Sequence, residues 1–244
     1  MKNRSHLSLI LFLSLFTAIC ILLCSVSIAF CKWEDSNTAA NAQNGFEAPT
    51  IIIDAGHGGE DGGAVGKNGI LEKELNLSIS EKLHDLFSAA GFKVVMTRET
   101  DTLLYDKNAD YKGRKKELDL AKRVEIASSY ENAVFISIHM NSFPDSKYSG
   151  LQVYYSKNHQ DSDEMAENIQ STVRECLQKN NNRQTKPAGK NIFVLDRITI
   201  PGVLIECGFM SNPDECNALT KDEYQKKLSL TIFSAVSKYI DKIP

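Results

Sequence analysis

The chain predicts an α/β fold, a single domain built on a mostly parallel, twisted sheet that carries helices on both faces. Short apolar runs, typical of buried strands, alternate with longer stretches in which apolar residues repeat at helical spacing. The chain has 244 residues, 42% hydrophobic and 24% charged, which is enough for one globular domain with a full core. In a sheet of this kind, the binding site forms beyond the carboxyl ends of the strands.

The amino-terminal segment differs in character from this domain. Residues 7–30 carry no charge and follow a basic amino end, a pattern typical of a transmembrane helix or a secretory signal. We therefore expect residues 1–31 to be a signal or membrane anchor and the polar residues 32–49 to be a linker. With either kind of segment, residues 50–244 are expected to be exported.

The first half of the domain predicts two strands and two helices. Residues 51–53 are β-branched throughout and are bounded by Asp and Gly, as in a buried strand. A stripe of apolar residues then predicts a helix over residues 72–90, which Gly91 closes. The apolar run at residues 92–96 predicts the second strand, and a further stripe at residues 115–130 predicts the second helix.

The second half continues the alternation of strands and helices. A buried strand at residues 134–138 runs into His139, and the last apolar run, at residues 201–205, runs into Glu206. The remaining elements are predicted strands at residues 151–155 and 192–195 and predicted helices at about residues 163–180 and 222–240. This regular alternation is the reason for expecting an α/β sheet rather than a sandwich or a bundle.

Three of the predicted strands lead into a residue that can bind a metal or transfer a proton. His57 follows the first strand across a Gly-rich turn, while His139 and Glu206 directly follow two later strands. Together with Glu72, at the start of the first helix, the histidines would supply two imidazoles and one carboxylate, a ligand set that suits a catalytic zinc ion. Glu206 would then be free to take a proton from the attacking water and give it to the leaving amine.

Each of these residues also has a purely structural explanation. His57 could stiffen the turn, His139 could be a satisfied core histidine, and an acid in the first helical turn is favoured by the helix dipole in any case. Spacing alone does not separate Glu72 from Glu74 as the third ligand. Glu206 is harder to explain away, because a carboxylate that ends an apolar run is costly to bury unless it is paired or solvated. The other histidines, which have less informative surroundings, are His6, His84 and His159.

Several other functions are excluded by motif, charge and cysteine usage. The Gly-rich turn is not a P-loop, because Gly66 and Lys67 are not followed by Ser or Thr, and it lacks the third glycine of a dinucleotide motif. A net charge of -3, with no basic block outside residues 112–116, argues against nucleic-acid binding. The cysteines of the domain are expected to be small buried thiols, with a bridge from Cys216 to Cys207 or Cys176 as the alternative.

Three ordered motifs carry a resemblance to a known family. DAGHGGEDGGAVGKNGILEKELNL, FISIHMNS and PGVLIECGFMSNPDE resemble the zinc-dependent N-acetylmuramoyl-L-alanine amidases, over about residues 50–240. The resemblance implies that residues 50–244 are a catalytic domain in which His57, Glu72 and His139 hold Zn²⁺ and Glu206 is catalytic. It selects Glu72 over Glu74. It also implies that peptidoglycan is the substrate, cut at the amide between the lactyl group of muramic acid and L-alanine.

The layout of the chain is similar to that of sporulation amidases of the CwlD type, which act in the spore cortex as muramic lactam forms. This similarity implies an exported enzyme that faces the cell wall and meets the membrane through its amino-terminal segment. Residues 99–116 could gate the site or dock an activating protein. Two alternatives stay open, namely a zinc peptidase that cuts the stem peptide and a non-catalytic protein that binds the wall.

Overall fold

The structure is a computed structural model that describes residues 16, 25–28, 32, 47–66, 69–106 and 112–242. Nearly all of the expected anchor and linker therefore lies outside the described residues. Among the residues that are described, no helix is both long enough and apolar enough to cross a membrane. The α/β domain follows as one compact unit that begins at Ala48.

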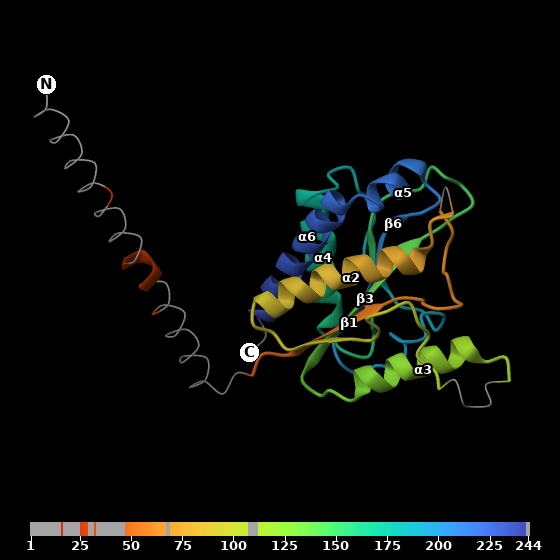
Figure 1. Cartoon of the computed structure of the whole chain (residues 1–244), viewed down its shortest axis with the longest axis horizontal. Helices are drawn as coiled ribbons and strands as arrows, with labels where there is room; N and C mark the ends of the chain where they lie inside the picture. Colours follow the sequence, from red (N-terminus) through yellow and green to blue (C-terminus); the bar gives the residue numbers. More distant parts are fainter. Residues whose placement is uncertain are drawn as a thin grey trace, which may run out of the picture. The chain divides into compact units, whose positions relative to one another are not determined.

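A mixed sheet of six strands forms the centre of this domain (Figure 1). In chain order the strands are β1 Thr50–Ala55, β2 Val94–Met96, β3 Ala133–Asn141, β4 Gln152–Tyr155, β5 Lys186–Pro187 and β6 Gly202–Phe209. Their spatial order is β2-β1-β3-β6-β4-β5. The first four strands in this order are parallel, whereas β4 is antiparallel to β6 and parallel to β5. The predicted sheet is thus confirmed as α/β, with its last two strands reversed.

Helices cover both faces of the sheet, as predicted. They are α2 Glu72–Ala89, α3 Lys115–Ser128, α4 Ser162–Cys176, α5 Pro213–Leu219 and α6 Asp222–Ile240. Figure 1 shows α3 on one face, while α2, α4 and α6 lie together on the other. Because strand side chains alternate between faces, Ile51 and Ile53 enter the core under α2 and α6, whereas Ile52 enters the core beside α3.

Two expectations about the later part of the domain are wrong. Residues 192–195 form a series of turns instead of a strand, although Val194 and Leu195 are buried in the core beside α3. The run is apolar because it packs against the sheet. A short apolar sequence looks the same whether it packs on a sheet or forms one of its strands. In addition, the helix expected to reach residue 180 ends at Cys176.

The three cysteines of the domain are free thiols, and no bridge joins them. Cys207 and Cys216 are buried, as predicted. Cys176 is exposed at the end of α4, so the expectation of burial is wrong for this residue. Its place in the last turn of the helix explains the difference, because the apolar face of α4 is supplied by other residues, such as Ile169 and Val173.

A buried cluster of charged residues ties α3 to the end of β1. Arg123 is 1% exposed and donates to Asp54 Oδ1 at 2.5 Å and to Asp119 Oδ2 at 2.8 Å. Asp54 also accepts hydrogen bonds from Thr97 and Ser137, at 2.8 and 2.6 Å. Burial alone would raise the pKa of Asp54, but Arg123 and these hydroxyl groups outweigh burial and lower it. The charges therefore stabilise each other in the folded state.

We expect an Arg123→Met substitution to lower the free energy of unfolding by about 3–5 kcal/mol, because two carboxylates would be left buried without a cation. Urea denaturation at pH 7 would measure the change. The pKa of Asp54 is lowered on folding, so its charge stabilises the wild-type fold above the usual aspartate pKa of about 4. The difference in free energy of unfolding between wild type and variant should therefore become smaller as the pH falls below that value.

Lys122→Met is the matched control for this substitution. Lys122 is an exposed neighbour on the same helix and pairs with Glu125 at 2.5 Å. Its replacement should change stability by no more than about 0.5 kcal/mol. Equal losses for the two variants would contradict the structural importance of the buried cluster.

Candidate metal centre

The structure brings together four side chains that the sequence places far apart. His57 lies in the turn after β1, Glu72 is the first residue of α2, and His139 and Glu206 lie near the carboxyl ends of β3 and β6. The last two are direct neighbours in the parallel register of these strands. All four therefore meet at one edge of the sheet, where a ligand site is expected in an α/β fold.

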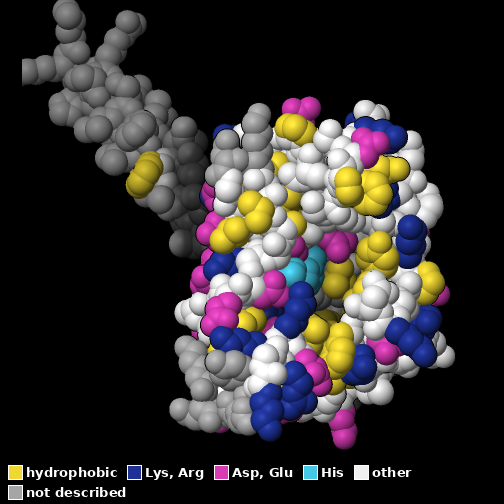
Figure 2. Space-filling model, turned by 90° about the vertical axis from the view of Figure 1, so that its right-hand side faces the viewer, with side chains coloured by type: hydrophobic (Ala, Val, Ile, Leu, Met, Phe, Trp, Pro, Cys, Tyr) yellow, Lys and Arg dark blue, Asp and Glu magenta, His cyan; other side chains and the backbone are white. Residues whose placement is uncertain are grey.

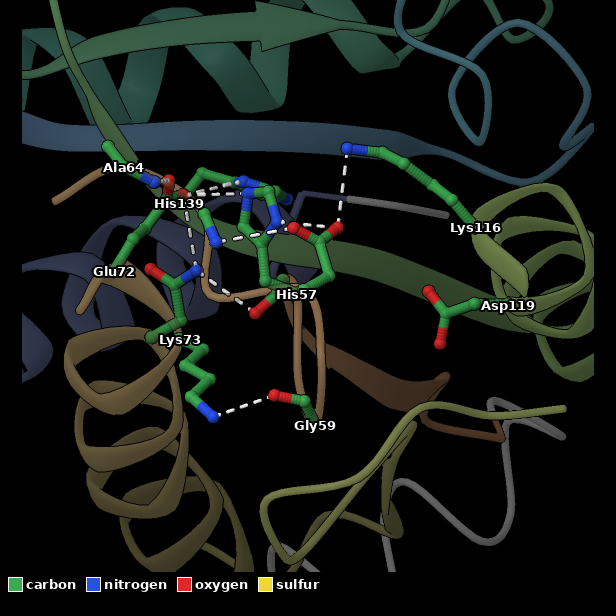
Figure 3. A network of polar contacts seen from close by, with 12 residues as sticks. His57, Gly59, Ala64, Glu72, Lys73, Lys116, Asp119 and His139 are labelled. Atoms are coloured by element: carbon green, nitrogen blue, oxygen red, sulfur yellow. Dashed lines mark hydrogen bonds and ion pairs between the residues drawn. The ribbon is translucent and has the colours of Figure 1, made fainter. Parts of the chain in front are cut away.

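His57, Glu72 and His139 form a compact donor set (Figure 3). Glu72 Oε1 lies 3.2 Å from His57 Nε2 and 3.0 Å from His139 Nδ1. One donor atom from each residue falls within 4.8 Å of the others, so all three can reach the same ion. Two imidazoles and a carboxylate leave a further position open on a tetrahedral ion, as in catalytic zinc sites. The residues present therefore fit a zinc ion.

The carboxylate of Glu72 is buried and held by backbone hydrogen bonds. It is 3% exposed and accepts hydrogen bonds from the backbone N–H groups of Ala64 and Met140, at 2.8 and 3.0 Å. Burial alone would raise the pKa of Glu72, but hydrogen bonds and charge from His139 and His57 hold it well below its usual range. Glu74, the alternative ligand by spacing, is exposed. The geometry thus favours Glu72.

The turn that carries His57 has an unusual backbone. His57 has a φ of 60°, in the left-handed region that a residue other than glycine rarely adopts. Two buried arginines hold the carbonyl groups around it. Arg98 donates to the oxygens of Ala55 and Gly56, at 2.8 and 2.9 Å, and Arg123 donates to the oxygen of His57 at 2.7 Å. These bonds offset the cost of the strained conformation.

Two glycines allow the side chains of His139 and Glu72 to approach this turn. A Cβ atom on Gly56 would lie 2.3 Å from Nε2 of His139. On Gly63, which has a φ of 68°, it would lie 2.6 Å from Oε2 of Glu72. The Gly-rich composition of the turn is therefore a requirement for close backbone approach, which agrees with the sequence pattern.

Asp61, Arg98 and Arg123 were not identified from the sequence. Asp61 Oδ2 lies 3.0 Å from Nδ1 of His57, where it orients the imidazole as acidic partners of metal-binding histidines do. Burial alone would lower the pKa of His57, but Glu72 and Asp61 raise it. The spacing of four residues from His57 to Asp61 was an available signal. The two arginines gave no periodic signal of their burial.

Glu206 lies beside the donor set but outside it. Burial, with a smaller effect of the Glu72 charge, raises its pKa to about 7. Its Oε2 atom is buried and has no hydrogen-bond partner among the described residues. A carboxyl group in this state can exchange a proton near neutral pH, as a general acid or base must.

A cavity of about 220 Å³ opens over these residues. His57, His139 and Glu206 form part of its wall. Apolar side chains such as Leu120 and Phe193 form another part, and charged side chains such as Lys116 lie among them. Figure 2 shows histidine side chains deep in a hollow, with hydrophobic and charged side chains around its rim. The donor set is therefore accessible to a molecule from solution, as a catalytic centre has to be.

Comparisons with known proteins agree with this site. A family model described as N-acetylmuramoyl-L-alanine amidase matches residues 51–238. The germination-specific N-acetylmuramoyl-L-alanine amidase of Bacillus subtilis (strain 168) is 37% identical over 189 residues, which cover 78% of this chain and 78% of that protein.

Two solved structures have the same fold. The CwlD amidase from Clostridioides difficile, determined in complex with the GerS lipoprotein, is 43% identical with a TM-score of 0.75, and the match covers 79% of this chain and 98% of that one. The amidase AmiC2 of Nostoc punctiforme is 30% identical with a TM-score of 0.68, over 80% of this chain and 98% of that one.

The matched region contains the sheet except for its first residue, Thr50, and all four side chains at its edge. The amidase expected from the sequence motifs is thus confirmed at the level of family and activity, with similarity to CwlD within that family. The protein is an enzyme whose substrate is the peptidoglycan of the cell wall. The chain belongs to the N-acetylmuramoyl-L-alanine amidase family.

Proposed function

We propose that the protein is a zinc-dependent amidase that hydrolyses the bond between the lactyl group of muramic acid and the L-alanine of the stem peptide. His57, Glu72 and His139 would hold the metal, and Glu206 would transfer the proton. The observation that carries this proposal is the compact donor set beside the carboxyl group of Glu206, whose Oε2 atom is buried without a partner among the described residues and whose pKa burial raises to about 7.

The chemistry divides between the ion and the chain. When bound, zinc supplies a Lewis acid that polarises a carbonyl oxygen and makes a water molecule more acidic. Glu206 accepts a proton from the attacking water and returns it to the amine of L-alanine as the bond breaks. Arg123 and Asp61 keep the His57 turn and imidazole in place while this happens. No serine or cysteine nucleophile is needed.

Zinc binding by Glu72 is tested against its neighbour Glu74. A Glu72→Gln substitution removes the anionic donor, so we expect zinc affinity to fall by at least about 100-fold. Glu74→Gln makes the same chemical change on the exposed side of the helix and should leave the affinity as it is. Metal content after dialysis and calorimetric titration with zinc would measure both. Equal affinity in wild type and Glu72→Gln would refute the proposed ligand.

The proposed role of Glu206 predicts a loss of turnover without a loss of zinc binding. Glu206→Gln keeps the size of the side chain but cannot accept a proton, so kcat should fall by about 10²–10⁴-fold while zinc affinity stays within the wild-type range. Single-turnover assays on the metal-loaded variant would separate chemistry from binding. A variant that keeps full activity would show that the proton is carried by another group.

The cut bond distinguishes the amidase from the two alternatives. Purified peptidoglycan is incubated with the protein, with and without a chelator, and the new amino termini are labelled. We expect amino-terminal L-alanine that appears only when zinc is present. Other new termini, or released D-alanine, would indicate a zinc peptidase, and binding without new termini would indicate a non-catalytic wall-binding protein.

A role in the spore cortex is the finer part of the proposal. It is supported by similarity to the germination-specific amidase and to the CwlD amidase. Because the latter was solved with a lipoprotein bound, we also infer that this chain has a lipoprotein partner. Export through residues 1–31, as an anchor or signal, would place the enzyme at the wall. Loss of muramic lactam from the cortex of a strain lacking the gene would test the role.

A further inference from the structure

A second groove lies next to the catalytic centre, on the side of β4. It has a volume of about 290 Å³, and its lining consists of Asn141, Phe143, Tyr148, Tyr154, Arg183 and Phe209. Gln152, on β4, is the direct register neighbour of Glu206 and accepts a hydrogen bond from Nη2 of Arg183 at 2.5 Å. One side chain therefore separates the guanidinium group from the register position of the proposed proton carrier.

Arg183 has unused hydrogen-bonding capacity. Its guanidinium lies 4.8 Å above the ring of Phe209 and makes the one hydrogen bond to Gln152, and no described carboxylate is close enough to form an ion pair with it. The Nε atom is buried and meets no acceptor among the described residues. A buried donor without a partner is costly. The groove that Arg183 lines is open to a ligand that brings an acceptor to the rest of the guanidinium group.

Aromatic rings form the outer wall of this groove. Phe143 and Tyr148 are 50% and 39% exposed, and their rings meet edge to face at 4.9 Å. Tyr148 in turn stacks on Phe209, with ring centroids 6.3 Å apart. Exposed aromatic side chains beside a polar anchor are typical of a surface that binds a ligand with both apolar and charged parts.

The two halves of the substrate differ in charge, and this difference identifies the occupant. On the sugar side, the lactyl carboxyl group is consumed in the amide, so it brings no charge to the site. The stem peptide is the leaving half and carries at least the carboxylate at its end. Its amine must also lie at Glu206 to receive the proton. Because Gln152 is the register neighbour of Glu206 and bonds to Arg183, the peptide begins one side chain away from the groove.

On the basis of the proposed function, we propose that this groove is the stem-peptide subsite, in which Arg183 binds a peptide carboxylate and the rings of Phe143 and Tyr148 cover the peptide's apolar groups. A guanidinium fork suits this task because it can donate two parallel hydrogen bonds to one carboxylate. The cavity at His57 and Leu120 then receives the muramoyl half.

The test compares two synthetic N-acetylmuramoyl peptides, one with free peptide carboxylates and one with the same carboxylates amidated. For the zinc-loaded wild-type chain, we expect kcat/KM to be about 10- to 100-fold higher on the free form, since a charge-assisted hydrogen bond is lost in the other. The Arg183→Gln variant should lose this preference, because its kcat/KM should fall on the peptide with free carboxylates and stay unchanged on the amidated peptide. Arg183→Lys, which keeps the charge without the fork, should retain part of it.

Two features of the chain help to assign any change in preference to the side chain of Arg183. The backbone of Arg183 is held independently of its side chain, because its N–H donates to Asn181 Oδ1 at 3.0 Å and its oxygen accepts from Arg174 at 2.8 Å. Arg114→Gln makes the same change at a side chain that is 57% exposed and should leave the preference at the wild-type value. Zinc content and melting temperature confirm that each variant is folded.

The outcomes separate this inference from the proposed function. Wild-type protein that cleaves both peptides equally well overturns the carboxylate subsite but leaves the amidase proposal standing. Equal slowing of Arg183→Gln on both peptides also overturns it, and would favour a sugar ring or a structural role for the groove. Wild-type protein that cleaves neither peptide contradicts the proposed function itself.

Discussion

The buried guanidinium of Arg123 is the interaction on which the rest of the site depends. It joins three parts of the domain, namely α3, the end of β1 and the turn at His57. A lone buried charge would be unfavourable. The buried arginine therefore needs Asp54 and Asp119, and these two carboxylates need the arginine. These hydrogen bonds from within the fold thus offset part of the cost of ordering the strained turn.

Strand periodicity explains why the side chains of the site share one face of the sheet. On the face toward α3, β3 presents Phe135, then Ser137, then His139, and the neighbouring β6 presents Leu204 and then Glu206. Apolar contacts therefore fill the middle of the sheet, and polar groups appear only toward its carboxyl edge. A shift of one residue in either strand would turn the histidine or the glutamate into the opposite core.

Much of this arrangement could be predicted from the sequence, because apolar runs that end in His139 and Glu206 indicate parallel strands that meet at one edge. The choice between Glu72 and Glu74 could not be made from spacing, since both lie in the first turn of α2 and only packing decides which one faces inward. The reversal of β4 and β5 also gave no signal, because the direction of a short strand is set by its connections. The burial of Arg123 was not predicted for a related reason, because charged and apolar residues alternate around it on α3 and nothing in their order marks one arginine as buried.

Glu206 lines the cavity at His57, and its register neighbour Gln152 links it to Arg183 in the second groove, so its position on β6 suits the proton transfer proposed for it. On one side, the cavity beside His57 and His139 combines apolar side chains with charged ones such as Lys116 and Arg123. On the other, β4 brings Gln152 and Arg183 alongside, so positive charge lies on the side proposed for the leaving peptide. A proton carrier has to reach both the attacking water and the departing amine, and a residue between the two spaces can do so without moving its backbone. The reversed strand β4 thus brings Gln152 and Arg183 to the side of β6 that faces away from β3.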